Sequence, residues 1–159
     1  MSKKHRKEER PEICVAPLAP EQVPDVLRMA EQFHAAAKLG ATPFDEGAAA
    51  AWLTNIQQTG VTLVATNGTP KPLGVIALVV MPSLFSMGMA ALPIFAWAEN
   101  AQVTGALLQA AKSWASEQGA LSLVIVAPSA APEMTRACVD AGFRLSTGFY
   151  LKGIEPCAK

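Results

Sequence analysis

The ten residues Glu99-Asn100-Ala101-Gln102-Val103-Thr104-Gly105-Ala106-Leu107-Leu108 decide the fold of this chain. An apolar run over 92–98 precedes them and predicts a strand, and apolar residues from Val103 onward recur at helical spacing as far as Gln118. A β-rich run follows at 121–126. A strand, a connection, an amphipathic helix and a parallel strand, in this order, are typical of an α/β unit whose helix begins beside a ligand.

Short strands and amphipathic helices are predicted on both sides of this unit. Before it we expect a strand over 13–18, a helix opened by Pro20-Glu21-Gln22 and stopped by Gly40, a helix from the N-cap Asp45 to Gly60, and a hairpin of strands 61–65 and 73–81. The fourth strand is expected over 90–98, interrupted by Pro93, and after the unit we expect a helix over 132–141 and a last strand or two over 143–154. The second helix is expected to place Trp52 and Ile56 on one face.

Length and composition indicate one globular domain. The 159 residues are 51% hydrophobic and only 16% charged, which is enough to bury a core without staples. So few charges predict either a surface partly covered by a partner or simply a small alanine-rich domain.

The charge is concentrated at the start of the chain. Residues 1–10 carry five basic and two acidic side chains, a net +3, so the rest of the zero-net-charge chain is −3. We therefore expect residues 1–11 to be a basic flexible tail that contacts an acidic partner or nucleic acid, or is only solvated. Residues 12–159 form the single domain, which shows no basic stripe for nucleic acid.

The cysteines and the hydropathy indicate a reducing compartment. Cys14, Cys138 and Cys157 are widely spaced, with no Cys-x-x-Cys pair, so neither a metal site nor a disulfide framework is expected. The basic start lacks the apolar segment of a signal peptide, and no apolar run is long enough to span a bilayer. We expect a cytoplasmic protein with no membrane partner.

Several local strings resemble the GNAT family, the general-control-related N-acetyltransferases. Pro72-Leu73-Gly74-Val75-Ile76 is similar to the family's third strand, 107–115 to its Leu-Leu-x-Ala-Ala-x-x-Trp-Ala helix, and 138–144 to its Tyr-x-x-x-Gly-Phe-Arg segment. The likeness covers residues 12–153. It implies an α/β fold of the GNAT-like acyl-CoA N-acyltransferase type, with a mixed central sheet of six to seven strands flanked by about four helices.

A narrower resemblance points to GNAT-like proteins of tailed phages. It rests on Met81-Pro82-Ser83-Leu84-Phe85-Ser86 and Ile94-Phe95-Ala96-Trp97. In that group the gene often lies among virion structural genes. The apolar loop 84–89 is either an acceptor-side lid or a docking patch.

The resemblance implies an acetyl-CoA site at the connection before the helix. Family members hold the pyrophosphate with an Arg/Gln-x-x-Gly-x-Gly/Ala loop, whose glycines let backbone amides approach the phosphates. Aligned on Leu107, those positions carry Glu99, Gln102 and Thr104, so the loop is eroded. An alignment shifted along the chain instead places Gln102 at the Arg/Gln position of the motif and Gly105 at its first glycine position. The implied cofactor-binding residues around the connection are Gln102, Val103, Thr104 and Gly105.

The remaining implied site residues lie on the fourth strand and after the fifth. The main chain of Ala96, Trp97 and Ala98 is expected to bind the pantetheine and thioester. The family's base position is Pro93 and its acid position is Cys138, which is more typical of a core thiol. We therefore assign no catalytic residue.

Three functions remain open on this evidence. We favour a GNAT-like protein that is non-catalytic or weakly catalytic, a pseudoenzyme acting as a binding or structural subunit, as in a phage virion. Its partners would be other proteins, phage structural proteins or a second copy of the chain. The alternative is an active acetyl-CoA-dependent N-acetyltransferase on an unknown amine, and the third is a protein that holds acyl-CoA as a structural or sensory ligand.

Overall fold

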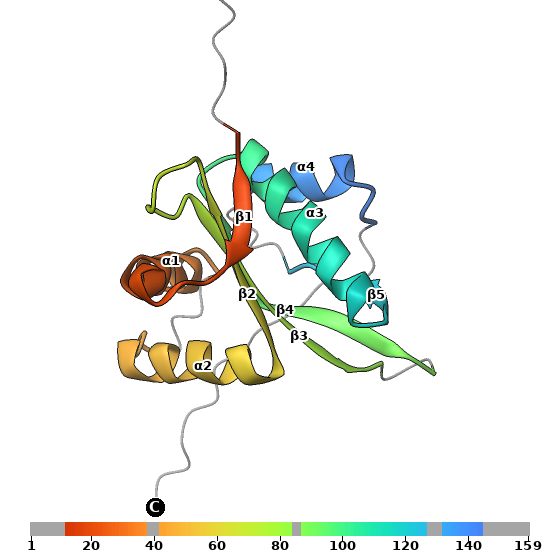
Figure 1. Cartoon of the computed structure of the whole chain (residues 1–159), viewed down its shortest axis with the longest axis horizontal. Coiled ribbons are helices and arrows are strands. Elements are labelled where there is room, and N and C mark those ends of the chain that lie inside the picture. The colour runs from red at the N-terminus through yellow and green to blue at the C-terminus, as the bar shows by residue number, and fades with distance from the viewer. Residues whose placement is uncertain (1–11, 38–41, 84–86, 127–131, 145–159) are drawn as a thin grey trace, which may run out of the picture.

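The computed structural model describes residues 12–37, 42–83, 87–126 and 132–144. These residues form a mixed sheet with helices on both faces (Figure 1). The elements are β1 (Cys14–Pro17), the 3₁₀ turn η1 (Pro20–Gln22), α1 (Val23–Ala36), α2 (Glu46–Thr59), β2 (Gly60–Thr66), β3 (Gly74–Pro82), β4 (Met89–Ala98), α3 (Ala101–Glu117), β5 (Ala120–Leu123) and α4 (Pro132–Asp140).

The strands lie in the sheet in chain order, β1-β2-β3-β4-β5. The first three pairings are antiparallel, and β5 runs parallel to β4, as the helix between them requires. The predicted strands are therefore confirmed up to β5, although β5 ends at Leu123 instead of Val126. The sheet has five strands in the described part of the chain, against the six to seven expected, and the segment expected to supply the last strands falls mainly in 145–159, outside the described residues.

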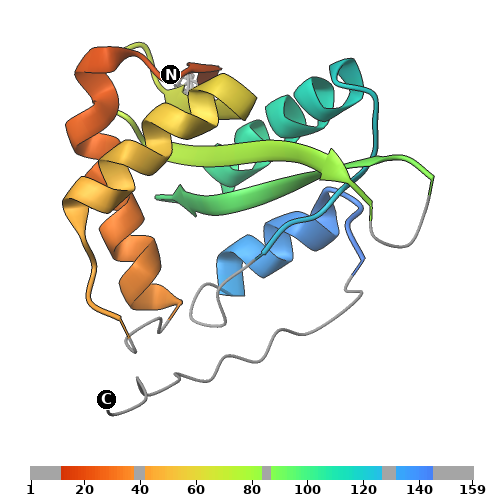
Figure 2. The same cartoon turned by 90° about the horizontal axis from the view of Figure 1, so that it is seen from below.

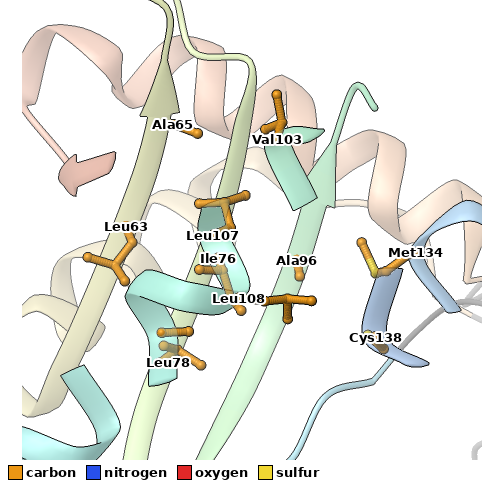
Figure 3. Packing of buried hydrophobic residues seen from close by; sticks show 11 residues of the cluster. Leu63, Ala65, Ile76, Leu78, Ala96, Val103, Leu107, Leu108, Met134 and Cys138 are labelled. Atoms are coloured by element: carbon orange, nitrogen blue, oxygen red, sulfur yellow. The ribbon is translucent and has the colours of Figure 1, made fainter. Parts of the chain in front are cut away.

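Two apolar cores lie on opposite faces of the sheet. One face is covered by α1 and α2, and the other by α3 and α4 (Figures 1 and 2). In Figure 3, Leu107 and Leu108 of α3 lie over Ile76 and Leu78 of β3. β2 and β3 are buried on both faces, which explains why their sequences are almost continuously apolar instead of alternating.

Local signals place the helix ends and the turn. Asp45 caps α2 as predicted, because its carboxylate accepts the N–H of Ala48 at 2.8 Å. The turn between β2 and β3 contains Gly68 at φ +85°, a conformation that glycine adopts without strain. The expected face of α2 is wrong: Ile56 is buried with Leu53, but Trp52 is 53% exposed.

The packing of α3 depends on one small residue of β3. A Cβ at Gly74 would lie 2.6 Å from Val103 Cγ1 and 3.0 Å from Leu107 Cδ1. A larger residue at this position would force the Val103 and Leu107 side chains to move. Gly74 therefore sets the position of the first two turns of α3, which border the candidate site.

Candidate functional site

The site begins where β4 separates from β5. The carbonyl of Ala91 accepts the N–H of Val124 at 3.0 Å, so Ala91 faces β5. Two residues later, Pro93 also faces β5, and proline has no N–H to continue the pairing. The register shift after it leaves Ile94 as the extra residue of a β-bulge. Pro93 and this bulge therefore end the β4–β5 ladder, but the strand is not interrupted at Pro93 as predicted, because β4 continues along β3 from Met89 to Ala98 with only a shift in register.

The last residues of β4 keep a free edge. The N–H of Glu99 donates to the carbonyl of Leu73 at 3.0 Å, which fixes the phase of the β3–β4 ladder. Because ladder bonds alternate, Trp97 directs its backbone groups toward β3, whereas Ala96 and Ala98 direct theirs away from it. In the described part of the chain, these groups of Ala96 and Ala98 have no hydrogen-bond partner. They form a short edge beside α3, in which Ala96 is only 6% exposed and Ala98 is half-buried, so an extended ligand could pair with it only if this edge opened.

The connection from β4 to α3 is only two residues long, Glu99 and Asn100. Asn100 is the N-cap of α3: its side-chain oxygen accepts the N–H of Val103 at 3.0 Å. Its carbonyl accepts both the N–H and the hydroxyl of Thr104, each at 3.0 Å. The amides of Ala101 and Gln102 have no partner among the described residues, so part of the helix end is free and part is closed by the chain itself.

An apolar cleft lies between the free edge of β4 and α3. It has room for about one water molecule, about 10 Å³, and spans about 250 Å³ when the open solvent at its mouth is included. Among the described residues that line it, none is charged and Thr104 is the only one with a polar side chain. The lining residues are Ile76, Ala96, Trp97, Ala98, Thr104, Leu107, Leu108, Ile125 and Met134. This environment suits an uncharged, partly apolar ligand more than a charged one.

The structure brings four of the seven predicted cofactor-binding residues together at this cleft. Ala96, Trp97, Ala98 and Thr104 line it. Val103 is fully buried in the core, and Gln102 and Gly105 are exposed on α3, with Gly105 in its second turn. Asn100 was not singled out from the sequence, although an asparagine just before a helical stripe is a common N-cap signal. The positions of Ile125 and Met134 depend on tertiary packing, which no local pattern encodes.

The two positions implied for proton transfer hold no ready acid or base. Pro93 has no titratable group. Cys138 of α4 is 8% exposed and packs in the same core cluster as Met134. Burial raises the pKa of the Cys138 thiol. No group of residues in the described ranges could hold a metal ion, and none of the described helices is long and apolar enough to cross a membrane.

The raised pKa of Cys138 makes a prediction for stability against pH. Unfolding exposes this thiol and returns it to its ordinary pKa of about 8.5. Its stabilising contribution is therefore complete below that value and is lost as the pH rises toward the higher pKa of the folded state. We expect Cys138→Ala to flatten the decline of unfolding free energy between about pH 8 and 10, measured by urea titration. The exposed Cys14→Ala variant is the control, and an unchanged slope in Cys138→Ala would contradict the assignment.

Solved structures of the GNAT acetyltransferase fold match this chain over most of its length. A transcriptional regulator from Bacillus halodurans C-125 matches with a TM-score of 0.73 and 14% identity, over 90% of this chain and 100% of that one. An acetyltransferase from Trypanosoma brucei gives 0.65 and 14% over 90% and 100%. An aminoglycoside acetyltransferase from an uncultured soil metagenomic sample, in complex with sisomicin, gives 0.61 and 16% over 88% and 95%. No protein-family model and no curated protein sequence matches.

These likenesses confirm the predicted fold class. The chain has the GNAT-like α/β fold, with a mixed sheet flanked by four α-helices in the described residues. Identities of 14–16% show the fold alone. The function has to be argued from the cleft.

Proposed function

We propose that this protein binds an acyl thioester of the acetyl-CoA class in the cleft between β4 and α3, and that it acts mainly by binding. The observation behind the proposal is the edge of β4, where the outward backbone groups of Ala96 and Ala98 have no hydrogen-bond partner among the described residues and border a cleft whose described lining is uncharged. A thioester-bearing arm can pair with such an edge while its methylene groups contact Leu107 and Leu108.

The absence of acid and base groups at the cleft supports binding over catalysis. In the part of the chain that the structure describes, its lining contains no side chain that titrates near neutral pH. Cys138 is buried in the same core cluster as Met134, and burial raises the pKa of its thiol. Positioned acids and bases typically supply a factor of about 10² to 10⁴ in rate, so acetyl transfer in this site should be slow at best.

A cleft-filling substitution tests the binding site. Ala98→Phe places a ring at the free edge of β4, so we expect acetyl-CoA or acetyl-thioester binding to weaken by at least about tenfold, because a filled cleft excludes the arm. Isothermal titration calorimetry on the full chain measures this. The matched control is Ala51→Phe, at an exposed position of α2, with affinity unchanged. Equal binding by wild type and Ala98→Phe would place the ligand elsewhere and end the proposal.

A second candidate is an active acetyl-CoA-dependent N-acetyltransferase on an amine. The free edge of β4 favours it as well, since it could orient a thioester carbonyl for direct attack by an amine that is already deprotonated. Acetylated product from a panel of primary amines, formed in proportion to enzyme and abolished in Ala98→Phe, would establish this function. Binding without product would select the first.

As a binding subunit, the protein is proposed to work with protein partners or a second copy of itself. The resemblance to phage proteins suggests a virion assembly as the setting. Most of the contacts predicted for such a subunit, the basic tail 1–11 and residues 84–86 of the apolar loop, lie outside the described residues. At the end of that loop, Met87 is fully exposed, and Leu121 on β5 is 76% exposed.

A further inference from the structure

We propose that this protein forms a symmetric dimer in which the edge strands β1 of two copies pair antiparallel, so that the two sheets become continuous. The partner at this edge is a second copy of the chain. β1 does not line the cleft between β4 and α3, so this dimer is independent of the ligand bound there.

One side of β1 carries backbone groups that the described sheet does not use. The N–H of Leu18 donates to the carbonyl of Thr62 at 2.8 Å, which fixes the phase of the β1–β2 ladder. Because ladder bonds alternate, Ile13, Val15 and Pro17 direct their backbone groups away from β2. Among the described residues, these outward groups have no hydrogen-bond partner. They form an edge with which another strand can pair.

This edge is open and uncharged. In Figure 1, β1 lies in front of β2, between α1 on one side and α3 on the other, and none of the described elements is drawn in front of it. Ile13 and Val15 pack against the core beneath α3, so Cys14 and Ala16 point to the opposite face, where both are exposed. Residues 13–18 contain no charged side chain, the usual device that keeps an edge strand from pairing.

Pro17 selects how a second β1 can pair. It has no N–H, so on this side it can accept a hydrogen bond but not donate one. In an antiparallel pair centred on Val15, the two Val15 residues exchange both of their bonds, and each Pro17 carbonyl accepts the N–H of Ile13 from the other copy. This makes about four hydrogen bonds across a two-fold axis, with the missing donors at the ends of the ladder. A pair centred on Ala16 would put Pro17 opposite Val15 and keep only about two.

Charge favours a second copy as the partner. The chain has 13 basic and 13 acidic side chains, so two copies carry no net charge that would keep them apart. In the pairing centred on Val15, Glu12 of one copy lies opposite Leu18 of the other. The net +3 of residues 1–10, which precede Glu12, therefore belongs to the end of the ladder at which the other copy presents the exposed Glu21, shortly after Leu18. Opposite charges are thus placed toward both ends of the ladder.

A proline on the unused side of β1 tests the pairing. Val15→Pro removes an N–H that the single copy does not use, and edge strands tolerate proline where the N–H faces outward. In sedimentation equilibrium on the full chain, we expect the wild type to approach twice the 16.7 kDa of one chain as concentration rises, and Val15→Pro to dimerise at least about tenfold more weakly. Val15→Ala keeps the N–H and should change the dimer dissociation constant by less than about threefold. A wild type that stays monomeric, or a Val15→Pro variant that is folded by circular dichroism and dimerises equally well, would overturn the proposal.

A disulfide cross-link tests the register of the same pair. Centring on Val15 puts Cys14 of one copy opposite Ala16 of the other as a non-hydrogen-bonded pair, whose Cα atoms lie about 4.5 Å apart, within disulfide range. Ala16→Cys in a Cys157→Ser background should therefore give a covalent dimer under mild oxidation, seen on a non-reducing gel, and adding Cys14→Ser should abolish it. No covalent dimer from Ala16→Cys would overturn the pairing centred on Val15. A covalent dimer in Cys157→Ser alone, through Cys14, would overturn it as well, because the ladder would then be centred on Cys14.

Discussion

Replacing Gly60 with alanine should lower the free energy of unfolding by about 3 kcal/mol, a fall of roughly 10 °C in Tm. Gly60 begins β2, and a Cβ there would overlap the carbonyl oxygen of Leu78 and lie 3.0 Å from the Cα of Val79. These are backbone atoms of β3, so no rotamer change can relieve the clash. The β2–β3 ladder, which lies in the middle of the sheet, has to open at its end. Urea unfolding followed by circular dichroism measures the loss.

The control is the same substitution where space is free. Gly105 is exposed in the second turn of α3, and a Cβ there meets nothing within 4 Å. Gly105→Ala should therefore raise stability by about 0.5 to 1 kcal/mol, because glycine is a poor helix former. If both variants shift stability in the same direction, close approach at Gly60 is not the reason for its glycine.

The fold was predictable because its strongest signals are local. The stripe of α3 that begins at Val103 and Leu107 is one buried face, and both residues are at most 3% exposed. Asp45 was predicted to begin α2, and the segment around Gly68 was predicted to be the turn between β2 and β3; the structure has both. Patterns of this kind are set within a few residues, and a folded chain must agree with them.

The errors lie where tertiary packing decides. Spacing alone groups Trp52 with Ile56, but the rotation of α2 on the sheet is set by which side chains fit against β2 and β3, and Leu53 fits instead. β5 is shorter than its apolar run because its partner β4 stops pairing after Ala91. In both cases the deciding contact is made by residues distant in sequence.

The candidate site divides in the same way. Proline has no backbone N–H to donate, so Pro93 already indicates from the sequence that a strand ladder ends near it. The edge of β4 could therefore be anticipated. The cap at Asn100 was missed although its position carries an N-cap signal, and only the geometry shows that its side chain accepts the Val103 amide. Comparing the sequence with the family motif reveals that the glycines are missing, but it does not reveal that the Asn100 side chain binds the Val103 amide.

Replacing Leu107 with alanine should cost about 3 kcal/mol and change which ligand the cleft accepts. Leu107 is 3% exposed, packs on β3 beside Gly74, and lines the cleft (Figure 3). Truncation removes buried contacts and leaves a space that the surrounding sheet cannot fill, since a sheet buried on both faces relaxes little. Urea unfolding gives the loss. The matched control, Leu121→Ala, loses the same atoms at a position 76% exposed and should change stability by less than about 0.5 kcal/mol.

The ligand preference of the same variant follows from where the new space lies. Because Leu107 lines the cleft, the space left by Leu107→Ala is continuous with the ligand site. A thioester with a longer acyl chain can then place its extra methylene groups there, each worth about 0.8 kcal/mol when buried. Binding of S-butyrylpantetheine relative to S-acetylpantetheine should rise about tenfold over wild type, measured below the variant's unfolding temperature. A preference that does not move would mean that the acyl group points away from α3, toward the open mouth of the cleft.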